Sequence, residues 1–322
     1  MRGMPISLVY LENSLVYSNA LVLLAIGLTM TYLTTKIPNF AHGSLAIIGA
    51  YLLFTVVAVY KASIALGFLA AFLAGAAAGL LEYLLVLRPL QRRGTDALGL
   101  MIATLGVDIF LIGVLNIYAD IVRGMNPVTG TSRDWSLRSF VLTRVAGLTE
   151  GTWISIGLVA FSLIALYLLL TRTKFGVAMR ASIENPQLAQ VLGVNVDLVY
   201  AVSWLIAGGL AGLAGGLMSF VLRINPATGS LEVVSVFAAS IVGGLQSLLG
   251  GVVGGYLVGL SETIGTRLLG ELLGLTGITA YRKVVSLALI VVVLLVAPEG
   301  LMGVNWRKLL RRMRGKAQKA EA

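Results

Sequence analysis

The sequence predicts an all-α polytopic membrane protein, a bundle of about 8–10 transmembrane segments with broken helices. Of its 322 residues, 58% are hydrophobic and 12% are charged, and the mean hydropathy is +0.94. That is more apolar surface than the interior of a soluble domain can bury. Apolar runs long enough to cross a bilayer recur along the chain, and glycine or proline interrupts some of them. Cysteine is absent, which excludes disulfides and thiolate metal sites.

A helix needs about 20 apolar residues to cross a bilayer. Candidate spans are residues 15–35, 40–60, 62–87, 97–122, 152–170, 198–222, 233–264 and 284–298. The stretch 233–264 is too long for one comfortable crossing and contains Gly243-Gly244 and Gly250-Gly251. It is therefore predicted to be a broken helix or hairpin of two half-length pieces. Counting it as two crossings gives nine passes, with the chain termini on opposite sides of the membrane.

Residues 1–299 are predicted to form the transmembrane domain, and residues 300–322 a basic amphipathic tail. The tail carries seven Lys or Arg and one acidic residue. Its apolar residues recur at helical spacing, typical of a helix on anionic lipid: Trp306, Leu309, Leu310 and Met313. The positive-inside rule places this tail and the connection 172–197 in the cytoplasm. The net charge of +10 is not accompanied by a nucleic-acid-binding module, so nucleic acid is not an expected partner.

The connection between the first two spans is predicted to break the helix. Pro38 biases Ile37 away from helical geometry, and Asn39 or Ser44 can cap a helix that restarts. Broken backbone at membrane depth is tolerated only inside protein or beside a watery cavity, and transporters place binding groups there. The alternative is a plain turn at the membrane surface with His42 at its edge. The residues alone leave both interpretations open.

Small residues repeat every four positions in three spans. Such stripes let the backbone of another helix approach closely. They predict a compact bundle or an interface with another subunit. The stripes are Gly67, Ala71, Gly75 and Gly79; Gly208, Gly212 and Gly216; and Gly251, Gly255 and Gly259.

The polar connection 172–197 carries the punctuation of a short helix. Asn185 suits the N-cap, Pro186 the first helical position and Gly193 the residue after the last turn, so a helix is predicted over 186–192. Leu188, Val191 and Leu192 then share one face. So short a helix is unstable alone in water, and something must pack on that face. A separate soluble protein is one candidate; lipid or neighbouring helices are the other.

Three segments carry a resemblance to a known family. They are Asn39-Phe40-Ala41-His42-Gly43, the polar segment around Arg180, Glu184 and Pro186, and Ile241-Val242-Gly243-Gly244 followed by Gly250-Gly251. Together they resemble the branched-chain amino-acid (LIV-type) ABC importer permeases, the type with the NFAHG motif. The resemblance spans roughly 15–298, and the long basic tail departs from it. Related permeases for urea or short amides share close variants of the motif.

The resemblance implies a permease subunit that moves branched-chain or other hydrophobic amino acids by alternating access. It implies a second homologous permease subunit, two cytosolic ATPase subunits and an external substrate-binding protein as partners in the cell membrane. The chain contains no G-x-x-x-x-G-K-[ST] phosphate loop. Accordingly no cofactor is expected in this chain, and ATP would be hydrolysed by the partners.

The same resemblance implies two sets of site residues. The substrate pathway would be lined by Asn39, Phe40, Ala41, His42, Gly43, Gly243, Gly244 and Gln246. Coupling to the ATPases would use Arg180, Glu184, Asn185, Pro186, Leu188, Ala189, Leu192 and Gly193.

Two other functions compete with this prediction. The intramembrane carboxylates Glu82, Asp108, Asp120 and Glu262 suit an ion-coupled secondary transporter acting alone, because buried ionisable groups often move ions. Surface pairing of Glu82 with Arg88 and of Asp120 with Arg123 is the simpler account for two of them. An intramembrane enzyme is disfavoured, because the chain has one histidine and neither H-E-x-x-H nor G-x-S-x-G.

Overall fold

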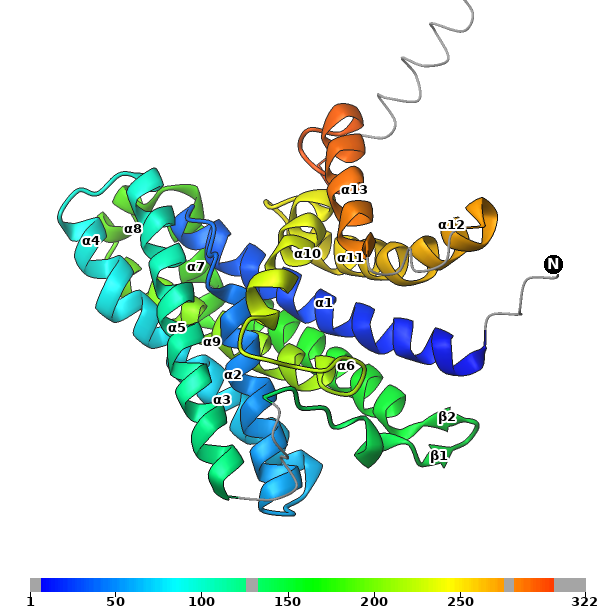
Figure 1. The fold of residues 1–322 in the computed structure, drawn as a ribbon. Helices are drawn as coiled ribbons and strands as arrows, with labels where there is room; N and C mark the ends of the chain where they lie inside the picture. The colour runs from blue at the N-terminus through cyan, green and yellow to red at the C-terminus, as the bar shows by residue number, and fades with distance from the viewer. Residues whose placement is uncertain (1–6, 126–132, 275–280, 304–322) are drawn as a thin grey trace, which may run out of the picture.

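The computed structural model describes residues 7–125, 133–274 and 281–303, which form a bundle of helices (Figure 1). Within these ranges, seven helices are long and apolar enough to cross a membrane. The strands there are two short ones that form an antiparallel hairpin, β1 (Arg144–Val145) and β2 (Leu148–Thr149). The predicted class, an all-α polytopic membrane protein, is confirmed.

The first half of the chain forms four long helical rods. They are α1 (Leu8–Thr35); α2 (His42–Phe54), prolonged by a π-helical turn (Thr55–Val59); α3 (Ile64–Glu82), prolonged by a π-helical turn (Tyr83–Leu87) into α4 (Arg88–Arg92); and α5 (Ala97–Met125).

The second half mixes long and short helices, after a short 3₁₀ helix at Arg138–Val141. They are α6 (Glu150–Arg172), α7 (Lys174–Glu184), α8 (Pro186–Val191), α9 (Val196–Met218), α10 (Thr228–Gly243), α11 (Leu248–Leu260) with a π-helical turn (Ser261–Gly265) leading into α12 (Thr266–Leu273), and α13 (Arg282–Val296).

Helix α1 runs through the centre of the bundle and packs against α6, α9, α10 and α11 (Figure 1). Its buried residues include hydroxyls, which must find hydrogen-bond partners away from water. Several find them one turn back on the same helix: Ser18 Oγ donates to the Ser14 carbonyl at 2.7 Å, and Thr34 Oγ1 donates to the Met30 carbonyl at 3.1 Å, whereas Thr29 Oγ1 has no partner among the described residues. Helix α1 can therefore bury the hydroxyls of Ser18 and Thr34 without hydrogen bonds to water.

The predicted small-residue stripes lie between helices of this chain. A Cβ built on Gly212 would lie 2.1 Å from the carbonyl oxygen of Ala71, and one on Gly75 would lie 2.3 Å from that of Gly208. The stripe of α11 meets α1 instead, where a Cβ on Gly255 would lie 2.6 Å from the Cα of Val22. Backbone contact of this kind needs glycine, so these stripes serve packing within the bundle.

The helix ends gather at two ends of the bundle (Figure 1). The C-terminus of α1 lies with α4, α7 and α8 at one end, which we call the α8 end. The N-terminus of α1 and the β1–β2 strands lie at the other, which we call the hairpin end. Successive long helices run back and forth between these ends, as a membrane-spanning bundle requires.

The predicted break in the stretch 233–264 is confirmed, but one of its two pieces is not half-length. Helix α10 ends at Gly243, where Gly244 adopts φ +108°. The second piece runs without interruption from Leu248 to Leu272, 25 residues that are enough for a full crossing. This helix continues beyond residue 264, where the predicted stretch ended, because a π-helical turn at Ser261–Gly265 keeps it continuous.

Two other expectations from the sequence are wrong in detail. The predicted span 198–222 ends early, because α9 stops at Met218 and the backbone of Ile224 then pairs with that of Trp135. Glu82 does not pair with Arg88. It is buried and accepts a hydrogen bond from Asn39, whereas Arg88 pairs with Asp197. The predicted tail, residues 304–322, lies outside the described residues.

Candidate functional site

The NFAHG segment is a buried break between α1 and α2. Lys36 ends α1 with left-handed geometry (φ +58°), and α2 begins at His42. In between, Asn39 holds the backbone in two ways: its Oδ1 accepts from the Ala41 amide at 2.8 Å, and its Nδ2 donates to Glu82 Oε2 at 3.1 Å. The connection is not an exposed turn, because Asn39, Ala41 and His42 are completely buried within the bundle.

His42 ties the start of α2 to the middle of α1. Its Nε2 lies 3.1 Å from the Leu24 carbonyl oxygen, and its Nδ1 makes no hydrogen bond within the described part of the chain. The imidazole fits because residue 27 is glycine: a Cβ there would lie 2.9 Å from His42 Nε2. This geometry suits a positioning role for His42 at the break.

A second polar contact joins this break to α5 and α10. Asp108, on α5, accepts from Ser44 Oγ at 2.5 Å and from Ser230 Oγ at 2.6 Å. Beside it the backbones of α2 and α10 touch, since a Cβ on Gly43 would lie 2.1 Å from the Gly229 carbonyl oxygen. Asp108, which sequence reasoning left unexplained, thus links three helices through hydroxyl donors.

The two predicted parts of the substrate pathway do not meet at one point. The NFAHG segment contacts α10 near its start through Gly229 and further along through Phe237, whose ring centroid lies 4.9 Å from that of Phe40. The turn at Gly243-Gly244 lies at the other end of α10. It packs against the segment after α13, where Leu301 N donates to the Val242 carbonyl at 2.9 Å. Gln246 is exposed beyond it.

The predicted coupling residues occupy α7, α8 and their junctions at the α8 end. Asn185 caps α8, its Oδ1 accepting from the Leu188 amide at 3.0 Å, and Pro186 takes the first helical position. Gly193 follows with φ +85°, as predicted. Arg180 Nη1 donates to the Leu170 carbonyl at 2.5 Å, which fixes α7 against the end of α6. Glu184 is exposed.

The apolar face of α8 points away from this chain. Leu188, Val191 and Leu192 are 55%, 83% and 74% exposed, whereas Ala189 is only 2% exposed and holds the helix to its neighbours. Exposed leucine and valine side chains on a capped, rigid helix form an unfilled contact surface. Because α8 stands at an end of the bundle, that surface is available to a molecule outside the chain (Figure 1).

Sequence reasoning missed an ion pair that holds this region in place. Asp197, in the first turn of α9, receives Arg88 Nη2 at 2.8 Å and Arg92 Nη2 at 2.7 Å. These contacts connect the end of the polar connection to α4, and α4 continues α3, which carries Glu82 and its bond to Asn39. No local pattern could reveal the pairing, because the partners are more than 100 positions apart in the chain.

A second missed feature is a buried charge cluster joining α1, α10, the turn after α11 and α13. Lys283 Nζ lies 2.6 Å from Glu232 Oε2, and Arg282 Nη2 lies 2.6 Å from Glu232 Oε1. The Tyr17 hydroxyl lies within hydrogen-bond distance of Glu232 Oε2 (2.7 Å) and Glu262 Oε2 (2.6 Å), and Ser235 and Ser286 donate to Glu262. The position of Glu262 is thereby explained. Glu232 carried no signal in the sequence beyond being an acidic residue in an apolar run.

A bundle of apolar helices with buried polar breaks defines a polytopic membrane protein of the transport type. The chain matches, over residues 10–294, the model of the family described as branched-chain amino acid transport system / permease component, and it belongs to that family. It is thus a permease subunit of an ABC importer, a multi-pass membrane protein that works with ATPase and substrate-binding components. The predicted family is confirmed.

Several relatives cover nearly the whole chain. The chain is 45% identical to a probable branched-chain amino acid transport permease protein LivH of Methanocaldococcus jannaschii, over 94% of each. It is 31% identical to the high-affinity branched-chain amino acid transport system permease protein LivH of Escherichia coli K12, over 90% of this chain and 94% of that one. Among solved structures, PsaBC from Streptococcus pneumoniae in complex with Fab matches with a TM-score of 0.50 and 12% identity. The match covers 90% of this chain and 92% of the other chain, and it shows a similarity of fold.

Proposed function

We propose that this chain translocates branched-chain or other hydrophobic amino acids by alternating access, driven by ATP that partner subunits hydrolyse. The complete importer would contain a second homologous permease subunit, two cytosolic ATPase subunits and an external substrate-binding protein. The match covers 94% of the length of each of these two relatives, and both are named for branched-chain amino acids. Their names support the substrate class. No cofactor would reside in this chain, and nucleotide chemistry would lie wholly in the partners.

The exposed face of α8 is the observation that carries the proposal. An apolar face with Leu188, Val191 and Leu192 open at the end of the bundle fits a groove on an ATPase subunit. Asn185, Pro186 and Gly193 fix the helix that bears it, and Arg180 fixes α7 against α6. The α8 end then faces the cytoplasm, the C-terminal tail lies on the same side, and residues 172–197 act as the coupling loop.

The structure also supplies a route by which movement at α8 could reach the buried break. Helix α8 packs against α7 and α9, the Asp197 ion pairs connect the start of α9 to α4, and Glu82 connects α3 to Asn39. Closure of the ATPase dimer would pull on α8 and rock the bundle about these contacts. Substrate would pass beside the break at Asn39, Phe40, Ala41, His42 and Gly43 and then the turn at Gly243, Gly244 and Gln246.

The carboxylates that suited a secondary transporter all have partners that stabilise the fold. Asp108 receives two serine hydroxyls, Asp120 pairs with Arg133 at 2.7 Å and Glu262 lies in the buried cluster. Glu82 accepts from Asn39. Among the described residues these contacts account for Asp108, Asp120 and Glu262 as structural groups, whereas Glu82 Oε1 is buried without a hydrogen-bond partner.

The substrate class is tested in vesicles that contain the complete importer, with ATP inside and the external binding protein outside. Labelled leucine is expected to accumulate in an ATP-dependent way, because the family relatives covering most of this chain are named for branched-chain amino acids. Labelled urea and acetamide, supplied with the same components, are expected to remain at background. Accumulation of urea or acetamide without accumulation of leucine would contradict the proposed substrate and favour the short-amide permeases of the same family.

A further inference from the structure

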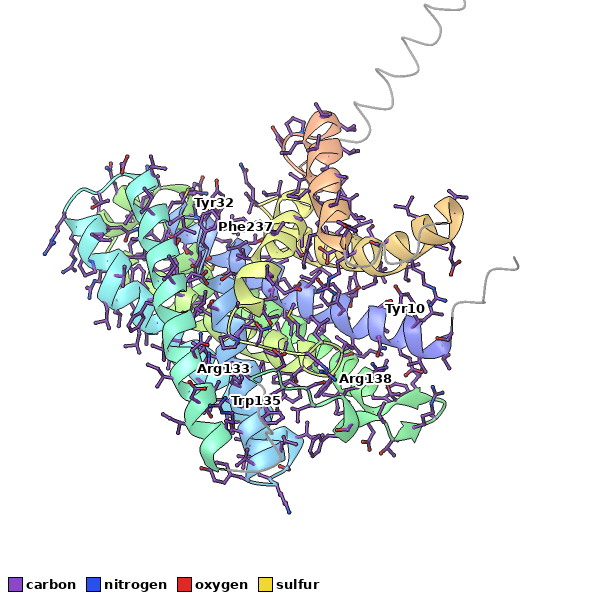
Figure 2. All side chains as sticks on the ribbon, viewed as in Figure 1. Tyr10, Tyr32, Arg133, Trp135, Arg138 and Phe237 are labelled. Atoms are coloured by element: carbon purple, nitrogen blue, oxygen red, sulfur yellow. The ribbon has the colours of Figure 1, made fainter. Side chains whose placement is uncertain are left out.

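A polar cavity of about 330 Å³ lies at the hairpin end of the bundle. Its walls come from α1, the residues after α9, the π-helical turn after α11 and the start of α13. Ligand pockets in proteins commonly measure about 300–1,000 Å³, so this one suits a small molecule. Figure 2 shows Tyr10, which also lines it, near the N-terminal end of α1 and far from Tyr32 at the α8 end.

The buried charge cluster forms one side of this cavity. Arg282 and Glu262 both line it, and Tyr17 lies between them. Arg282 is held by Glu232 at 2.6 Å, and Glu262 is held by Tyr17 at 2.6 Å with Lys283 Nζ at 3.5 Å. Two cations and two carboxylates balance formally, so the cavity keeps both signs of charge in fixed positions.

Some polar groups in the cavity have bonding capacity to spare. An arginine side chain has five N–H donors, and within the described residues Arg282 makes its hydrogen bond to Glu232 through Nη2 alone. The amide of Asn13, which also lines the cavity, makes no hydrogen bond to any described residue. Val221 and Leu222 provide an apolar part of the lining.

We propose that this cavity binds the transported amino acid as a zwitterion. The free edge of the Arg282 guanidinium binds the α-carboxylate, because a planar fork of donors matches that group. Asn13 Oδ1 accepts from the α-ammonium, the negative charge of Glu262 in the cavity wall attracts it, and Val221 and Leu222 contact the aliphatic side chain. The assignment rests on the proposed function, and it names the groups that would recognise that substrate inside the membrane subunit.

The same chemistry predicts which solutes the cavity rejects. Urea and short amides carry neither charge, so they would leave the spare donors of Arg282 facing a neutral group. An amine that lacks the carboxylate would place its cation beside Arg282 without compensation. Leucine and 3-methylbutylamine share a side chain and differ by the carboxylate, and they therefore form a matched pair of probes.

Thiol protection tests the proposal, since the chain has no cysteine and one introduced thiol reports without interference. Thr263→Cys places the thiol on the cavity wall at a residue with no proposed role in binding. The purified complex, with cysteine-free partners, is labelled in nanodiscs without nucleotide. Leucine at about ten times its dissociation constant should slow modification roughly tenfold. The same concentration of 3-methylbutylamine should not.

Thr143→Cys is the matched control, because Thr143 is exposed near the β1–β2 strands and outside the cavity. The rate of modification of this thiol should be the same with and without leucine. Equal rates at Thr263→Cys with and without leucine, or equal protection by the amine, would overturn the proposal. If Thr263→Cys does not yield a folded complex, Leu222→Cys provides a second reporter in the cavity lining.

Substitution of Arg282 separates recognition from a structural role. In the Thr263→Cys background, Arg282→Lys keeps a cation beside Glu232 but loses the fork, so the leucine concentration for half-protection should rise roughly tenfold or more. An unchanged value in a folded complex would contradict the role of Arg282. ATP-driven leucine uptake by the parent importer is measured in parallel. Its absence would refute the proposed function, whereas normal uptake without protection would refute this site alone.

Discussion

Replacing both Leu188 and Leu192 by aspartate is expected to abolish substrate-stimulated ATP turnover in the reconstituted importer. Both side chains are more than half exposed on α8, and neither supports the bundle, so the permease itself should fold and insert normally. Two charges placed in an apolar interface remove its anchors, each worth about 2 kcal/mol, for a loss of affinity of up to roughly 10³-fold.

The matched control for this double substitution is Leu142→Asp. Leu142 is 54% exposed, but it follows the 3₁₀ helix Arg138–Val141, away from α8. It introduces the same change of side chain at the surface, and turnover should match that of the parent importer. Co-purification of the ATPase subunits reports docking directly. Full turnover and full co-purification in the double variant would refute the docking role of α8.

Gly212→Leu is expected to prevent assembly of a stable bundle. A Cβ at this position would lie 2.1 Å from the Ala71 carbonyl oxygen, so α9 and α3 would have to separate. Ordinary overpacking of a core costs about 1–3 kcal/mol, and here the obstacle is backbone rather than a movable side chain. The yield of monodisperse protein in detergent should fall to background, and any residual protein should melt well below the parent.

Gly106→Leu makes the same substitution on α5, where a Cβ meets no atom within 4 Å among the described residues. It should leave both yield and melting temperature close to those of the parent. If Gly212→Leu behaves like Gly106→Leu, then the close contact of α3 with α9 is not what holds these helices together.

Local signals in the sequence predicted the features that depend on neighbouring residues. Asn185, Pro186 and Gly193 placed α8 to within one residue, since a cap, a first-turn proline and a left-handed glycine act on the adjacent backbone. Pro38 and Asn39 likewise marked the break before α2. The small-residue stripes predicted close helix contact because their four-residue repeat is a property of a single helix.

Contacts between distant residues could not be predicted in this way. Asn39 with Glu82, Asp197 with Arg88 and Glu232 with Lys283 depend on which helices become neighbours, and no spacing along the chain encodes that choice. The continuation of α11 through its π-helical turn was missed for a related reason. The Glu262 carboxylate in that turn is satisfied by Tyr17, Ser235 and Ser286, which come from three other helices.

The central claim is that this chain moves its substrate only with energy from ATP hydrolysed by other subunits. The most direct test compares leucine uptake by vesicles containing the complete importer with uptake by vesicles containing this chain alone under a proton or sodium gradient. We expect uptake in the first case to require ATP and uptake in the second to stay at background. Gradient-driven leucine accumulation by the chain alone, equal to that of the complete importer, would contradict the claim.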